Sequence, residues 1–154
     1  MKRWMWILGA LLAFQLMEKT ASDIEQLQPV QLLEVSRSRG EILLRTDTGD
    51  QGRGRNLEAA MKNMADTSEK RIFLETADQL LLRKNTEYMV PELYRLLRPA
   101  VRVCRVGQKV DLKQAAEFLS THEPRNTLGK LYAGEGQLPE LKVERGRLKL
   151  AGNH

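Results

Sequence analysis

The segment from Trp4 to Met17 constrains this chain more than any other part of it. Two basic residues precede the run of fourteen (WMWILGALLAFQLM), only Gln15 within it is polar, and a Glu-Lys pair ends it. A basic n-region followed by an apolar h-region is typical of a signal peptide or membrane anchor. Fourteen helical residues reach about 21 Å, less than the roughly 30 Å of a bilayer core. Cleavage after Ser22, retention as an anchor, and a helix buried in a cytosolic fold all stay open.

The charge around this segment predicts its orientation. Lys2, Arg3 and the terminal amine favour the inner side of a membrane, which sends the following residues outward. We therefore expect residues 1–22 to be a signal peptide or membrane anchor. Residues 23–154 then form a single mixed α/β domain, membrane-associated or exported, on the extracytoplasmic face.

In that domain, the spacing of apolar residues is typical of a strand in some segments and of a helix in others. Helices are expected over 57–66 with Asn56 as N-cap, after Asn85 or Thr86 until Pro99, and after Asp111 until Glu123. Strands are expected over 30–35, 41–45, 71–83 and 100–106, followed by a looser stretch over 124–140 and a hairpin that pairs 141 and 143 with 150 and 148.

This order of elements defines a fold class. A β β α β α β α order that ends in a hairpin predicts an α+β fold with a mixed sheet and two or three packed helices, preceded by the N-terminal signal or anchor helix. The run from Arg71 to Arg83 is the expected central strand, because its Ile72–Leu74 and Leu80–Leu82 clusters are typical of a strand buried on both faces.

The charge balance argues against nucleic acid as the partner. The chain has 25 Lys and Arg against 20 Asp and Glu, and residues 23–154 retain a net charge of only +3. A protein that follows a phosphate backbone concentrates positive charge more strongly. The Phe and Tyr residues are scattered and offer no platform for stacking bases.

The sequence also provides no set of residues for metal, cofactor or catalysis. Cys104 is the single cysteine and only His122 and His154 carry imidazoles, so no Cys/His zinc set can be assembled. Cys104 lies among valines, which predicts a buried thiol, and His122 is expected at a helix C-terminus. We expect a protein without cofactor that is not an enzyme.

Two stretches are candidates for binding. The first is the glycine-rich GDQGRGRN over 49–56, expected as a loop that enters a helix N-terminus. Such a loop is either a surface connection or an anion contact. Its candidate anion- or partner-binding residues are Gly52, Arg53, Gly54, Arg55 and Asn56.

The second stretch is basic and contains no acidic residue between positions 95 and 109. It is either a solvated rim or a docking site for anionic headgroups or the acidic surface of a partner. The residues of this candidate basic rim are Arg95, Arg98, Arg102, Arg105 and Lys109.

Several segments together resemble a known family. They are the early strand pair DIEQLQPVQLLEVSRSRGEILL, the glycine approach to a helix GRGRNLEAAMKNM, the strand KRIFLETADQLLL, the helix end LYRLLRP and the strand-turn-strand LPELKVERGRLKLAG. In this order they resemble the N-terminal domain of the C-subunit lipoproteins of spore germinant receptors, the Ger(x)C family. The resemblance covers residues 23–152 and consists of hydrophobicity and glycine patterns.

The resemblance implies a subunit of a membrane protein complex without known enzymatic chemistry, and it carries over no catalytic residue. Two departures accompany it. The family is lipid-anchored through a cysteine after the h-region, where this chain has none, and its members have further domains that have no counterpart here. The implied protein is a shortened relative without a lipid, and its ligand stays open.

Overall fold

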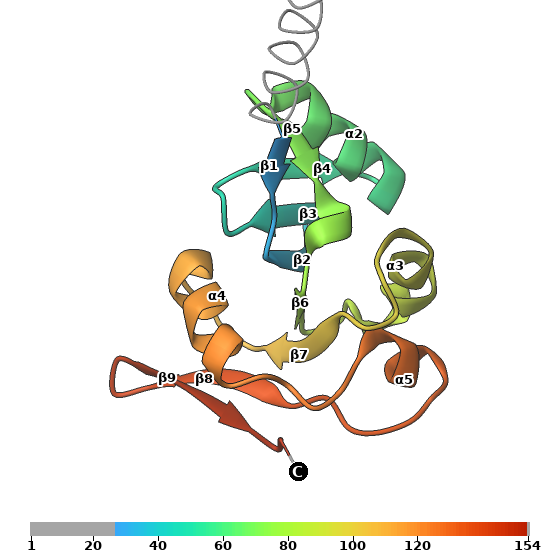
Figure 1. Cartoon of the computed structure of the whole chain (residues 1–154). Helices are drawn as coiled ribbons and strands as arrows, with labels where there is room; N and C mark the ends of the chain where they lie inside the picture. Colours follow the sequence, from blue (N-terminus) through green and yellow to red (C-terminus); the bar gives the residue numbers. More distant parts are fainter. Residues whose placement is uncertain (1–26, 154) are drawn as a thin grey trace, which may run out of the picture.

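The computed structural model describes residues 27–153, which form a mixed sheet with helices on both faces (Figure 1). The strand order in this seven-stranded sheet is β4-β3-β2-β6-β7-β8-β9, and a separate parallel pair is formed by β1 and β5. Strands β2, β6, β7 and β8 run parallel, while antiparallel hairpins complete both edges. The strands are β1 Leu27–Pro29, β2 Leu32–Ser38, β3 Glu41–Thr46, β4 Gln51–Gly54, β5 Arg71–Phe73, β6 Gln79–Arg83, β7 Arg102–Val106, β8 Glu140–Glu144 and β9 Arg147–Ala151.

The helices divide between the two faces of the sheet. Helices α2, α3 and α5 contribute to the larger hydrophobic core on one face, and α4 to a second core on the other. Two single 3₁₀ turns are also present: η1 joins β5 to β6, and η2 leads from β6 into α3. The bounds are α2 Leu57–Thr67, η1 Leu74–Thr76, η2 Glu87–Met89, α3 Val90–Leu96, α4 Leu112–Thr121 and α5 Leu128–Tyr132.

The predicted α+β class with a mixed sheet is confirmed, but the expected number of helices is not. Residues 27–153 contain four α-helices instead of two or three. The additional one is the short α5, inside the stretch predicted to be loose. Thr127 begins it, because its hydroxyl accepts a hydrogen bond from the Lys130 amide at 3.3 Å. The predicted signal or anchor helix over 1–22 lies outside the described residues.

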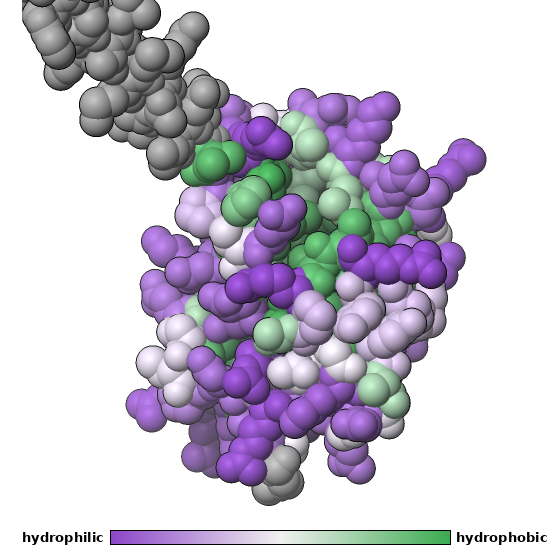
Figure 2. Space-filling model, turned by 45° about the vertical axis from the view of Figure 1, so that its right-hand side comes forward, coloured by the Kyte–Doolittle hydropathy of each residue, from purple (hydrophilic) through white to green (hydrophobic). Residues whose placement is uncertain are grey.

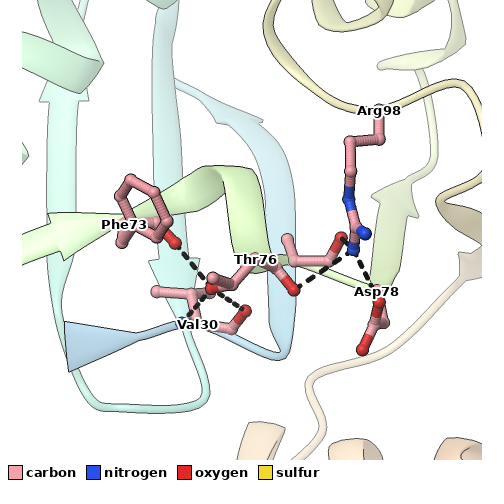
Figure 3. A network of polar contacts seen from close by, with 6 residues as sticks. Val30, Phe73, Thr76, Asp78 and Arg98 are labelled. Carbon is pink, nitrogen blue, oxygen red and sulfur yellow. Dashed lines mark hydrogen bonds and ion pairs between the residues drawn. The ribbon is translucent and has the colours of Figure 1, made fainter. Parts of the chain in front are cut away.

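The prediction of one strand over 71–83 is wrong, because this segment is divided in two. Residues 71–73 form β5, which pairs with β1, and only 79–83 form the central strand β6. Between them the chain turns through η1, and the Thr76 hydroxyl fixes this turn. It accepts from the Val30 amide at 3.0 Å and lies 2.7 Å from the carbonyl of Phe73, to which it donates (Figure 3).

The prediction for the segment after β6 also needs correction. Neither Asn85 nor Thr86 caps an α-helix, because η2 comes first and α3 begins at Val90 without a side-chain cap. The Thr86 hydroxyl instead donates to the carbonyl of Arg83 at 2.7 Å. Pro91 does lie in the first turn of α3, where its missing N–H costs nothing.

The C-terminal hairpin β8–β9 agrees with the sequence prediction. Leu141 is paired with Leu150 and Val143 with Leu148, in the expected register. Its turn places Arg145 and Gly146 at φ of 51° and 76°. Two consecutive positive φ angles are the requirement of a type I′ turn, whose twist matches that of the flanking strands.

On the face of the sheet that α2 and α3 cover, partly buried side chains surround the larger core. Figure 2 brings these helices forward and shows apolar surface gathered between purple polar groups. Half-buried Met61, Ile72 and Leu74 pack against the buried side chains of this core. Leu96 of α3, by contrast, is 40 % exposed.

We predict that Thr76→Val destabilises the fold by about 1–3 kcal/mol. The substitution keeps the shape of the side chain but leaves the part-buried amide of Val30 without its acceptor. Chemical denaturation of the parent and variant measures the difference. Thr76→Ser is the matched control, since it retains the hydroxyl, and a Val variant as stable as the Ser variant contradicts the assigned role.

Candidate functional site

The glycine-rich segment is not the loop that its sequence predicts. Residues 51–54 form edge strand β4, and α2 packs directly on it. A Cβ built on Gly52 would overlap the Ala60 carbonyl and come within 2.5 Å of the Met64 Cβ. A Cβ built on Gly54 would come within 2.4 Å of the Ala60 nitrogen in the α2 backbone. The two glycines therefore allow a close approach between strand and helix, which is a structural role.

The other residues of that first candidate set have separate positions. Asn56 is the N-cap of α2, as predicted, and its side-chain oxygen accepts from the Ala59 amide at 2.8 Å. Arg55 is exposed beside it, whereas Arg53 lines a hollow on the other face of the sheet. The structure thus assigns the five residues to packing, capping and surface positions instead of one cradle.

The residues of the candidate basic rim are also dispersed by the fold. Three arginines pair with acids from distant parts of the chain: Arg98 with Asp78 at 2.7 Å, Arg102 with Glu123 at 3.6 Å and Arg105 with Glu87 at 2.6 Å. Arg102 and Arg105 are three positions apart on β7 and therefore project from opposite faces. Arg95 lies in the last turn of α3, and Lys109 lines the same hollow as Arg53.

This hollow, with a volume of about 470 Å³, is the strongest candidate site and is named the basic groove. It lies on the face of β4, β3, β2 and β6 that is opposite to α2. Its floor is formed by Glu34 and Ser36 of β2, Leu43 of β3 and Gln51 of β4. Six cationic residues line it: Arg37, Arg45, Arg53, Arg83, Lys84 and Lys109.

The single carboxylate in the basic groove is already neutralised. The side chain of Glu34 is only 2 % exposed, and Arg45 binds it with Nη2 at 2.8 Å from both carboxylate oxygens. Such a bidentate pair occupies the acceptors of the carboxylate. Five cations are left, and within residues 27–153 none of them forms an ion pair.

A second hollow of about 610 Å³ continues the basic groove toward the start of α4 and shares Arg45, Gln51 and Lys109 with it. Its carboxylates are engaged in turns and caps. Asp47 accepts from the amides of residues 31 and 32, and Asp111 caps α4 by accepting from the Gln114 amide at 2.8 Å. This second hollow is lined by three acids and three cations, so the excess of positive charge lies in the basic groove.

The residues considered for reactive chemistry are in structural positions. Cys104 is buried between the sheet and α4, as predicted, and this burial raises the pKa of its thiol to about 12. His122 is the C-cap of α4, also as predicted, and its ring stacks on Phe118 with centroids 4.3 Å apart. In the described residues, no three His, Cys, Asp or Glu side chains form a group that suits a metal ion.

None of the helices in residues 27–153 is both long and apolar enough to cross a membrane. Comparison of the chain with protein-family models, with curated proteins and with solved structures finds no match.

Sequence reasoning missed the basic groove as a unit. It singled out Arg53 and Lys109, but in different candidate sets, and it did not select Arg37, Arg83 or Lys84. A signal was present in β3 and β4, where buried residues alternate with more exposed ones that include Arg45 and Arg53. It required the strand order and register to be interpreted, because these residues come from four strands and a loop.

We predict that Gly52→Ala destabilises the fold by about 1–3 kcal/mol, because the new methyl group displaces α2 from β4. Thermal or chemical denaturation measures the loss. Gly107→Ala is the matched control, since its added Cβ meets only the ends of the Glu140 and Lys84 side chains, at 3.3 and 3.6 Å. The control is expected to stay within about 0.5 kcal/mol of the parent. Equal stability of both variants contradicts the close approach.

We predict that Cys104 of the native protein is not alkylated by iodoacetamide at pH 8. The thiolate is the reactive species, and a pKa of about 12 leaves almost none of it. Intact-mass spectrometry measures the label, and the same reaction in denaturant, where the thiol is exposed, is the control. Labelling at similar rates in both conditions contradicts the burial.

Proposed function

We propose that this protein is an exported, membrane-associated interaction module without enzymatic activity, of the kind represented by the N-terminal domain of germinant receptor C subunits. The observation that carries the proposal is the succession of Lys2 and Arg3, the apolar run over 4–17, and the folded domain that the structure describes over residues 27–153. Such a succession is typical of a chain whose folded part is on the outer side of a membrane.

The order of elements supports the family part of the proposal. A strand pair β2–β3 is followed by a glycine-containing strand that enters α2, then by the central strand β6 and by α3, which ends shortly before Arg98-Pro99. A strand-turn-strand, β8–β9, closes the domain. The same order is the basis of the resemblance in the sequence, which implies a subunit of a membrane complex that meets its partners by surface contact.

The charge distribution favours binding over catalysis as the activity. The basic groove gathers unpaired cations over a polar floor, and the one carboxylate within it is held by Arg45. General acid–base chemistry needs a titratable group free to exchange a proton with a substrate. Fixed positive charge instead provides attraction for a negatively charged partner.

A second candidate function is a small extracytoplasmic protein that binds an anion or ligand. The sequence assigned this role to the glycine-rich segment 49–56. In the structure, Gln51 and Arg53 of that segment line the basic groove, so the candidate contact moves there. Titration with phosphate tests it, because a ligand that binds only the folded state raises the melting temperature.

We predict that residues 1–30 export a fused reporter. The apolar run enters the bilayer while the basic N-terminus stays inside, so an alkaline phosphatase fusion is active and a mass spectrum gives either an N-terminus after Ser22 or an uncleaved anchor.

The control fusion carries Leu11→Arg and Leu12→Arg. Each arginine in the centre of the segment opposes insertion by about 2.5–3.5 kcal/mol, which abolishes export. Cytosolic location of the parent fusion with an intact Met1 overturns the membrane-associated function.

A further inference from the structure

We infer that the basic groove is the docking site for an extended acidic segment of a partner protein. The inference rests on the proposed function, since it names the surface and the partner chemistry of the interaction module. The first observation is that a helix covers only part of one face of the sheet. Helix α4 packs over Leu32, Leu81 and Cys104, while the same face farther along β2, β3 and β4 is lined by polar and charged side chains.

The register of the strands determines how the cations are spaced. Arg53 of β4 is paired with Leu43 of β3, which is paired with Ser36 of β2. In the parallel pair β2–β6, Val35 is opposite Leu82, so the next residues along, Ser36 and Arg83, share the same row. One row therefore has a cation at each end, separated by three strand spacings, about 14 Å.

This spacing matches an extended peptide. Alternate side chains of an extended chain point the same way and repeat every 6.6–6.8 Å, so carboxylates four residues apart are separated by about 13–14 Å. An acidic segment that crosses the strands can thus meet Arg53 and Arg83 together. Leu43 and Ser36 lie between these two arginines and provide an uncharged floor for the residues in between.

The other cations extend this surface along the hollow. Lys84 and Lys109 are exposed there, whereas the Arg37 side chain alternates to the other face of β2, where its Nη1 donates to the Tyr88 hydroxyl at 3.1 Å. Because these charges are distributed along a hollow and do not converge on a point, they suit several carboxylates better than one small anion. The concave shape also suits a protruding chain segment better than the plane of a membrane.

The test uses the full chain in non-ionic detergent micelles and a fluorescent eight-residue peptide in which Glu and Ser alternate. Anisotropy titration at 50 mM NaCl is expected to show saturable binding, at least tenfold tighter than for the peptide in which Gln replaces Glu. Binding weakens at 500 mM NaCl, because salt screens exposed charges.

The decisive comparison is between two triple charge reversals. Arg53→Glu, Lys84→Glu and Lys109→Glu together change the basic groove, and each exposed ion pair is worth up to about fivefold in affinity, so a loss of tenfold or more is expected. Lys62→Glu, Lys70→Glu and Lys130→Glu make the same change in net charge at exposed positions outside the groove. This control is expected to change affinity less than threefold.

Several results overturn the inference. They are equal losses in the two triple variants, no discrimination between the Glu and Gln peptides, and a groove-dependent response confined to inorganic phosphate or to micelles doped with phosphatidylglycerol. If thermal melts show that the triple reversal does not fold, Arg53→Gln, Lys84→Gln and Lys109→Gln replace it, with an expected loss of about threefold or more.

The peptide-binding test and the export test can fail independently of each other. Peptide binding by the purified chain does not depend on where the chain is located in the cell. A cytosolic reporter fusion together with groove-dependent binding overturns the membrane-associated function alone. An exported fusion together with groove-independent binding overturns the docking site alone.

Discussion

The structure depends on the burial of one strand from both sides. Leu80, Leu81 and Leu82 of β6 are all 0 % exposed, and their side chains alternate between the two faces of the sheet. Each fully buried leucine contributes about 1.5–3 kcal/mol, but only if both faces are covered. Helices are therefore required on both sides, and the parallel neighbours β2 and β7 occupy the edges of β6. The two hydrophobic cores and the mixed topology result from this requirement.

The same arrangement explains why neither candidate binding stretch forms a single site in the structure. The segment over 95–109 has no acidic residue in sequence, yet the fold brings Asp78, Glu87 and Glu123 against three of its arginines. Conversely, the cations of the basic groove are separated by many residues in the chain and become neighbours because β4, β3, β2 and β6 lie side by side. Charge that looks concentrated along the chain is dispersed, and charge that looks dispersed is concentrated.

Predictions from sequence succeeded where the controlling interactions are local. The caps Asn56 and Asp111 each bond an amide three residues ahead, so the chain itself carries the whole signal. The C-terminal hairpin has its register fixed by Arg145-Gly146 and by alternating apolar residues. The prediction failed over 71–83, where the turn at η1 depends on a bond between Thr76 and Val30, 46 residues away. It also failed at β4, whose glycines are explained only by α2.

The sequence alone determined the class of the fold, the starts of α2 and α4, the C-terminal hairpin and the buried state of Cys104, because propensity, capping and hydrophobic period act over a few residues. Only the tertiary structure decided which cations remain unpaired and which face of the sheet stays open. Those properties depend on strand order and register, which bring Arg53, Arg83 and Lys109 to one hollow and hold Glu34 against Arg45. Long-range pairing of this kind is encoded by the whole core at once, so no single stretch of the chain reveals it.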